Sequence, residues 1–188
     1  MLLGMIADDA EAAKLINDML VRIHGFRSIN MQDRIRLSLI RLNPYVATAG
    51  MQLSDLIAKF GWQQSLKQFD ELRDLLLRME NDCTRNCWGY SFWLRISLDY
   101  VITQDMEVGK RDWLIWPITH IEEYNEIQDC SGTVIKVTRS KLSKTAVIEE
   151  TEAQIWDYKL NFSGSKEALY SNLLEVINAC KLAENGES

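Results

Sequence analysis

The residue types with the most readily recognised chemistry, histidine and cysteine, are few in this sequence. Its two histidines are His24 and His120. His120 follows an apolar segment and precedes two glutamates, so its imidazole is a candidate general base near neutral pH. No serine or cysteine forms a recognisable nucleophile motif with it, and a catalytic site needs partners in defined roles. The sequence therefore assigns no catalytic residue.

Cysteines are candidate metal ligands, and Cys83 and Cys87 are four residues apart, which would place them on one side of a helix. A structural zinc site needs four ligands, and no histidine lies near this pair in the sequence. Cys130 and Cys180 are isolated. We therefore predict no metal, no cofactor, and a pair of buried thiols that pack as small apolar side chains.

Six tryptophans are unusual for a chain of 188 residues. Most are expected in the core, where large aromatic rings usually pack. Trp113 and Trp116 bracket the apolar part of the segment DWLIW. Either ring, if exposed, is a candidate anchor for a protein partner, because aromatic side chains dominate interface hot spots.

The composition is that of an acidic globular protein. With 21 Lys and Arg against 27 Asp and Glu, the formal charge is −6, and 47% of the residues are hydrophobic. This excludes a disordered chain and disfavours a nucleic-acid-binding surface, which needs a basic excess. No apolar run reaches the ~18 residues of a membrane span, and the first residues lack the basic start of a signal peptide. We therefore expect a single cytoplasmic domain over residues 1–188, without membrane or direct nucleic-acid contact.

Hydrophobic periodicity predicts strands that alternate with helices. Short apolar or alternating segments indicate strands at 1–6, 26–31, 112–116, 133–139 and 156–162. Apolar spacings of three and four indicate helices at 10–23, 33–42, 52–60, 66–80, 86–101, 121–129 and 165–182. This order predicts an α/β fold with a mainly parallel sheet covered on both faces, and a helix-rich insertion between the second and third strands. Ligands of such sheets bind beyond the carboxyl ends of the strands.

Several short motifs match, in order and over nearly the whole chain, the pattern of one enzyme family. They are Gly25-Phe26, Asp33-Arg34-Ile35-Arg36, Leu42-Asn43-Pro44, Leu53-Ser54-Asp55, Gly61-Trp62, Arg73 with Leu75-Leu76, Arg85, Gly89, Trp93, the segment 132–139, Glu150-Thr151, and Asn161 with Gly164-Ser165 and Leu169. The chain resembles the deoxynucleoside monophosphate kinases of tailed bacteriophages, a branch of the P-loop nucleotide kinases. The resemblance implies a three-layer P-loop-kinase-like domain, with a helical acceptor-side subregion at about 44–105.

The resemblance also implies an acceptor site for a deoxynucleoside monophosphate. The residues at matching positions are Asp33, Arg36, Arg73, Arg85, Trp93, Glu123, Arg139 and Glu150. Two or three arginines that converge on one cleft would hold a monophosphate through paired hydrogen bonds. In the alternative interpretation, these arginines pair with nearby carboxylates, such as those of Glu71, Asp74, Asp82 and Asp99.

The donor side departs from the family pattern. The family has G-x-x-x-x-G-K between the first strand and helix, where backbone N–H groups and the lysine hold phosphate. Here residues 7–14 read ADDAEAAK without a glycine, Ala13 stands at the lysine position, and Lys14 is one residue out of register. The carboxylates of Asp8, Asp9 and Glu11 should repel one another and any phosphate. We therefore expect their removal to raise stability or leave it unchanged.

A second departure follows Trp116. The family has D-V-R-F-x-N-E there, with an aspartate on the metal side and an arginine on phosphate. This chain has Pro117 and Thr119 at those two positions, and only Glu123 matches. Phosphoryl transfer depends on positioning and charge neutralisation, so we predict no transfer from ATP with magnesium.

The favoured functional prediction is a catalytically inactive, kinase-like phage protein that binds a host protein in the host cytoplasm as an inhibitor or regulator. The negative charge would suit a basic partner. One alternative is a nucleotide-binding protein or residual kinase that takes a deoxynucleoside monophosphate. Another is a non-catalytic partner subunit of an active kinase, and a homodimer is compatible with the family.

Overall fold

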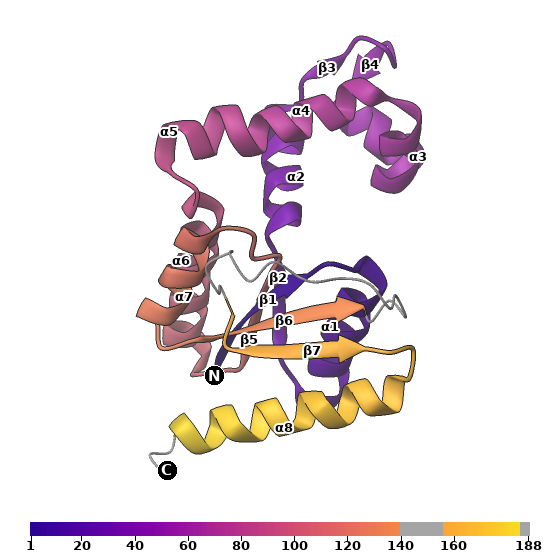
Figure 1. Cartoon of the computed structure of the whole chain (residues 1–188). Helices are drawn as coiled ribbons and strands as arrows, with labels where there is room; N and C mark the ends of the chain where they lie inside the picture. The colour runs from indigo at the N-terminus through magenta and orange to yellow at the C-terminus, as the bar shows by residue number, and fades with distance from the viewer. Residues whose placement is uncertain (140–155, 185–188) are drawn as a thin grey trace. The chain divides into compact units, whose positions relative to one another are not determined.

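The computed structural model of the chain describes residues 1–139 and 156–184. These residues form two compact units, whose elements are labelled in Figure 1. Unit 1 comprises Met1–Asn30 together with Leu94 and the described residues that follow it, and unit 2 comprises Met31–Trp93. The chain therefore leaves unit 1 once and returns to it once.

Unit 1 is built on a five-stranded sheet with the strand order β2-β5-β1-β6-β7. Its strands are β1 (Leu2–Ala7), β2 (Arg27–Asn30), β5 (Trp113–Trp116), β6 (Thr133–Arg139) and β7 (Tyr158–Phe162). Every pairing in this sheet is parallel. The predicted α/β fold with a mainly parallel sheet is thereby confirmed.

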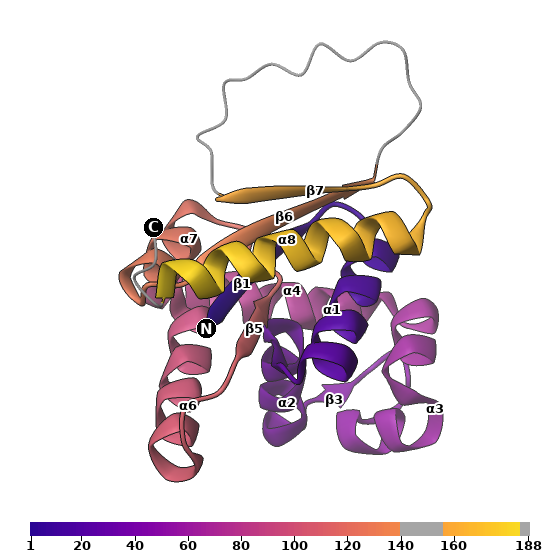
Figure 2. The same ribbon diagram turned by 90° about the horizontal axis from the view of Figure 1, so that it is seen from below.

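Helices cover both faces of the sheet, which gives unit 1 three layers. They are α1 (Ala10–His24), α6 (Phe92–Val108), whose first two residues belong to unit 2, α7 (Ile121–Asp129) and α8 (Lys166–Glu184). α1 and α8 pack together on one face (Figure 2). α7 covers the other face, where Ile127 lies next to Gly4 of β1. The side chain of Arg95 on α6 bonds Glu126 on α7 at 2.6 Å.

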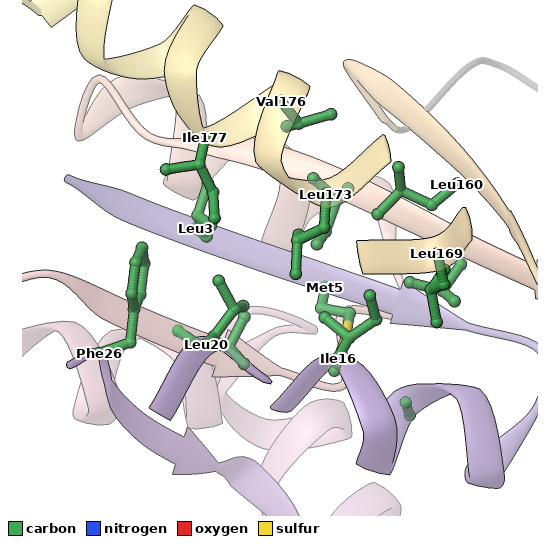
Figure 3. Close-up of a cluster of buried hydrophobic side chains, with 14 of the residues drawn as sticks. Leu3, Met5, Ile16, Leu20, Phe26, Leu160, Leu169, Leu173, Val176 and Ile177 are labelled. Atoms are coloured by element: carbon green, nitrogen blue, oxygen red, sulfur yellow. The ribbon is translucent and has the colours of Figure 1, made fainter. Parts of the chain in front are cut away.

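The apolar layer between the sheet and the α1–α8 pair fixes α1 beyond the end of β1. Strand alternation directs Leu3 and Met5 of β1 to this side. There they meet Ile16 and Leu20 of α1 and Leu173 of α8, all fully buried (Figure 3). Each such side chain contributes about 1.5–3 kcal/mol relative to an exposed one. This packing therefore holds the start of α1 close to the carboxyl end of β1.

Unit 2 is the predicted helix-rich insertion. Its elements are α2 (Met31–Leu42), β3 (Tyr45–Val46), β4 (Met51–Gln52), α3 (Leu53–Gln68), α4 (Asp70–Glu80), the π-helical turn η1 (Asn81–Arg85) and α5 (Asn86–Trp88). A separate core holds it together, made of Leu39, Val46, Leu53, Leu56 and Leu72. The β3–β4 hairpin was not predicted, because two-residue strands carry no period.

The predicted helix over 86–101 begins where α5 begins, but it is interrupted at Gly89 and ends too early. Gly89 has a φ of 95°, which ends α5, and α6 begins only at Phe92 and continues to Val108. A residue in the left-handed region cannot continue a right-handed helix. The predicted helices at 121–129 and 165–182 are confirmed as α7 and α8, and Ser165 caps α8 by accepting a hydrogen bond from the backbone N–H of Ala168 at 3.2 Å.

The prediction of a pair of buried thiols is wrong for Cys87, which is exposed. Of the two isolated cysteines, Cys130 is exposed and Cys180 is buried. Cys87 lies on the short α5, which has no buried residue. No helix within residues 1–139 and 156–184 has the length and apolar content to span a membrane.

Candidate functional site

The connection between β1 and α1 lies at the carboxyl edge of the sheet, where the family pattern places phosphate. β1 ends at Ala7 and α1 begins at Ala10, so only Asp8 and Asp9 connect them. The Asp8 N–H donates to the Val137 carbonyl at 3.1 Å, which keeps the chain beside β6 as it leaves the strand. Residues 10–13, which the pattern assigns to a loop, are therefore the first turn of a helix.

Within that turn, Ala13 stands at the position that the pattern gives to the phosphate-binding lysine. Its side chain is 3% exposed and belongs to the apolar core of unit 1. Lys14 is exposed on the helix surface. A helix rotates by about 100° per residue, so the one-residue offset directs Lys14 away from the direction of Ala13.

Asp9 occupies the N-terminus of α1 with its own carboxylate. Its Oδ1 accepts a hydrogen bond from the Ala12 N–H at 2.9 Å, so Asp9 is the N-cap of the helix. The free N–H groups of a helix N-terminus attract anions, and here a carboxylate of the chain itself takes that place.

Arg139, the last residue of β6, neutralises the acidic turn. Its Nη1 lies 3.1 Å from Asp9 Oδ2 and 3.2 Å from Glu11 Oε2, and its guanidinium lies 5.6 Å from the centre of the Phe162 ring. The hydrogen bond from Ala12, followed by Arg139, lowers the pKa of Asp9. The expected repulsion among Asp8, Asp9 and Glu11 did not include this cation, because the sequence does not reveal that β6 brings Arg139 to Asp9 and Glu11.

Glu123, the one match in the second departing segment, is a structural residue in this arrangement. Its side chain is 0% exposed, and Oε2 accepts hydrogen bonds from the backbone N–H groups of Thr119 at 2.6 Å and His120 at 3.2 Å. These contacts close the loop between β5 and α7. His120 is the N-cap residue of α7.

The two candidate partner-binding tryptophans differ in exposure. Trp113 is 3% exposed, and its Nε1 donates to Asp105 at 2.9 Å, so its predicted availability to a partner is wrong. The burial arises because Trp113 faces Tyr100 of α6 edge-on. Trp116 is half-buried against the main core, and its Nε1 donates to the exposed Ser28 at 3.0 Å.

In unit 2, two of the predicted acceptor arginines pair with carboxylates one helical turn away. Arg36 bonds Asp33 at 2.9 Å, and its guanidinium lies 5.7 Å from the centre of the Trp62 ring. Arg73 pairs with Asp70 and also donates to the Leu66 carbonyl at 2.9 Å.

The third arginine of unit 2, Arg85, lies in a largely buried ion pair. Its Nη2 is 3.2 Å from Glu80 Oε1, and the two side chains are 12% and 17% exposed. Gln32 of α2 donates to the other oxygen of Glu80 at 3.4 Å. Since Gln32 and Arg36 are four residues apart on α2, Arg36 and Arg85 lie toward the same side of unit 2.

Trp93, the last residue of unit 2, contacts the π-helical turn that carries Arg85. It is 4% exposed, and its Nε1 donates to the Thr84 hydroxyl at 3.0 Å, next to Arg85 in the π-helical turn. π-helical turns are frequent at functional sites. The roles of Gln32 and Glu80 were not predicted, and no motif in the sequence marks them.

The predicted site residues thus form two groups. Unit 1 brings Arg139 to Asp9 and Glu11, and unit 2 pairs Arg85 with Glu80, which also accepts a hydrogen bond from Gln32 of α2. The carboxylate partners are not those expected, since Glu71 instead accepts hydrogen bonds from the backbone of Ala47 and Thr48. Glu150 lies outside the described residues.

Comparison with known proteins adds evidence on the fold. No protein-family model matches the sequence, and no curated protein sequence matches it. Among solved structures, dephospho-CoA kinase from Campylobacter jejuni is similar with a TM-score of 0.50 and 15% identity, over 100% of this chain and 98% of that one. Shikimate kinase from Aquifex aeolicus has a TM-score of 0.42 and 10% identity, over 97% of this chain and 99% of that one. The chain therefore has an α/β fold similar to that of dephospho-CoA kinase.

Proposed function

We propose that this protein is a catalytically inactive, phage-encoded relative of the P-loop nucleotide kinases that acts by binding. The observation that carries the proposal is the two-residue connection between β1 and α1, capped by Asp9. A kinase of this class holds the donor phosphates with a loop of backbone N–H groups and a lysine. Here the first turn of a helix stands in place of the loop, and Ala13 is buried.

The second departing segment supports the same proposal. Pro117 and Thr119 stand where the family pattern has a metal-side aspartate and a phosphate-binding arginine. Glu123 is engaged by the backbone of Thr119 and His120. At the family's positions, the described residues therefore lack the lysine, the metal-side aspartate and the phosphate-binding arginine that stabilise the charge developing during phosphoryl transfer.

A coupled assay with ATP, magnesium and each deoxynucleoside monophosphate tests the catalytic part. We expect no turnover above that of a protein-free blank. A rate near ~1 s⁻¹, the low end for kinases, would contradict the proposal.

The proposed mode of action is binding to a host protein in the host cytoplasm, as an inhibitor or regulator of that protein. Trp116 supports it, because this ring is only half-buried at the carboxyl end of β5. Capture of host proteins with the tagged chain, followed by mass spectrometry, identifies the partner. Trp116→Ala should reduce the capture of that partner, whereas Trp156→Ala, a change of the other half-buried tryptophan of unit 1, should not.

A second candidate function is binding of a deoxynucleoside monophosphate. It is favoured by Arg85, whose pair with Glu80 is largely buried, and by Arg36, which lies one turn from Gln32 on α2, since guanidinium groups match phosphate geometry. Calorimetric titration should then show binding that weakens with salt and weakens further in Arg36→Ala. The control is Arg22→Ala, which changes an exposed arginine of α1. Equal affinities in the two variants would remove this candidate.

A third possibility is that the protein is a non-catalytic subunit of an active kinase. In that case the captured partner is itself a kinase.

A further inference from the structure

A polar patch lies on the face of the β6–β7 strand pair that is opposite to α1 and α8. Lys136 pairs in register with Lys159, and Thr138 pairs with Asn161. Leu160, between Lys159 and Asn161, is buried in the α1–α8 core, so its two neighbours point to the opposite face. Lys159 and Asn161 are exposed, and Lys136 and Thr138 are half-buried. We call these four residues the β6–β7 patch.

The two lysines of the patch form an electrostatically unfavourable pair. Neighbouring strands are about 4.8 Å apart, and like charges directly opposite each other on one face destabilise a sheet. Within residues 1–139 and 156–184, no carboxylate forms an ion pair with either lysine. The Lys136 ammonium lies 4.3 Å from the centre of the Trp156 ring, a contact that positions the charge without neutralising it.

This concentration of positive charge is local. Outside residues 31–93, the sequence contains 13 Lys and Arg against 20 Asp and Glu. Carboxylate partners are therefore abundant in unit 1, and Arg139 at the end of the same strand has two of them. A general basic excess cannot explain why two lysines are paired on β6 and β7.

The polar half of the patch adds hydrogen-bond donors. The Thr138 hydroxyl donates to Asn161 Oδ1 at 2.7 Å, which orients the amide. The amide nitrogen of Asn161 then carries two N–H donors that no residue of the described chain accepts. Two lysine side chains and an amide N–H₂ group thus lie on one face, where they can donate hydrogen bonds to a ligand.

We propose that the β6–β7 patch binds the phosphoryl group of a phosphorylated small molecule. A phosphoryl group offers several acceptor oxygens and up to two negative charges, which matches two lysines on neighbouring strands better than a singly charged carboxylate does. The patch shares no residue with the β1–α1 connection or with the arginines of unit 2. The inference is therefore independent of the proposed function.

Calorimetric titration with inorganic pyrophosphate and with dTMP tests the patch. The double variant Lys136→Gln/Lys159→Gln should bind both ligands at least about tenfold more weakly than the natural chain, the loss of about one charge-assisted hydrogen bond. The matched control is Lys110→Gln/Lys166→Gln, which removes the same charge at two exposed lysines away from the patch and should leave the affinity unchanged. Absence of binding at millimolar ligand, or equal affinities in the two double variants, would overturn the proposal.

Thermal melting gives a second, independent measurement. Without ligand, Lys159→Gln should raise the melting temperature, because it removes the cross-strand repulsion. Pyrophosphate should raise the melting temperature of the natural chain and not that of the double variant. Binding of a single-stranded oligodeoxythymidylate without binding of pyrophosphate or dTMP would identify a nucleic-acid surface and overturn the small-molecule proposal.

Discussion

At the scale of single residues, the Asp9 carboxylate is central to the β1–α1 connection. One oxygen accepts the hydrogen bond of the Ala12 N–H, and the other pairs with Arg139. A bound phosphate would need the same N–H groups and a cation of the same kind. Asp9 therefore supplies, from the chain itself, the negative charge that a bound phosphate supplies in a P-loop.

Replacing Asp9 with alanine should destabilise the protein, because α1 loses its cap and Arg139 loses a partner. We expect a fall in melting temperature of about 2–4 °C, the range for loss of an N-cap in a protein of this size. The control is Asp8→Ala, since Asp8 is exposed and neighbours the cap. Because the pKa of Asp9 is lowered, its contribution is present above about pH 4 and is lost as the pH falls below that value. Equal melting temperatures for the two variants would show that Asp9 has no special role.

We expect His24 to give the stability of the protein a second pH dependence, around pH 6. Its buried Nε2 has no hydrogen-bond partner within the described residues, and its ring lies 5.9 Å from that of Tyr170 on α8. Burial, followed by the positive charge of Lys181, lowers the pKa of His24 below 6.5. The unfolded chain therefore takes up a proton at a higher pH than the folded chain does.

Stability should consequently be complete above about pH 6.5 and decrease as the pH falls through the unfolded and folded pKa values. Urea unfolding between pH 7.5 and pH 5 measures this decrease. In His24→Gln, the part of the slope due to this residue should disappear. An identical pH dependence in the two proteins would contradict the assignment.

At the scale of elements, Asp157 fixes the start of β7. Its two carboxylate oxygens accept hydrogen bonds from the Tyr124 hydroxyl at 3.0 Å, the Gln128 amide at 2.8 Å and the Val134 N–H at 2.7 Å. These donors belong to α7 and β6. A single side chain therefore joins the last strand of the sheet to a helix and to the neighbouring strand.

Asp157→Ala should lower the free energy of unfolding by about 1–3 kcal/mol, because three donors lose their acceptor. Asp129→Ala, at the exposed end of α7, is the control and should change it by no more than about 0.5 kcal/mol. Chemical denaturation gives both values. A loss in Asp129→Ala as large as in Asp157→Ala would show that charge alone is responsible.

The elements that the sequence predicts well are those with a strong period and clear ends. The strand 133–139 and the helix 121–129 have their predicted bounds, because β-branched residues and spacings of three and four define them. The break at Gly89 was missed, since one glycine within an aromatic run does not show by its type alone that it will adopt a positive φ. The kink at Gly61, with a φ of 71°, falls at the predicted interruption between the helices 52–60 and 66–80.

Long-range pairs in the candidate site could not be predicted. Arg139 and Asp9 are separated by 130 positions, and Gln32 and Glu80 by 48. Sequence spacing indicates which residues share a helix face, and it contains no information on which strand end meets which helix start. The family pattern supplied positions for the arginines, and their partners became evident only from the fold.

At the scale of the whole molecule, charge is unevenly distributed between the two units. Residues 31–93 contain eight Lys and Arg against seven Asp and Glu, so the acidic excess of the chain belongs to the remainder. A basic partner of the proposed kind should therefore bind through unit 1. Its capture should weaken when the salt concentration is raised, because attraction between exposed charges is screened.

The salt dependence should be smaller for a variant in which exposed acids of unit 1, such as Glu122 and Asp129 on α7, are replaced by their amides. Capture at a series of salt concentrations measures it. Amide replacement of exposed Asp55 and Asp74 in unit 2 is the matched control. Equal salt dependence in both variants would show that the partner does not bind at the exposed acids of α7.

The insertion of unit 2 between β2 and β5 has a consequence for the order of folding. Unit 2 is continuous in sequence, so its internal contacts close loops that lie within residues 31–93. β2 instead pairs with β5 across unit 2, with Arg27 opposite Trp113. Because closing a long loop costs entropy before any contact is gained, non-local pairings form slowly. On the ribosome, residues 31–93 are synthesised before β5, the strand with which β2 pairs. We therefore expect unit 2 to fold first. The sheet of unit 1 then forms from the segments that precede and follow unit 2 in the sequence.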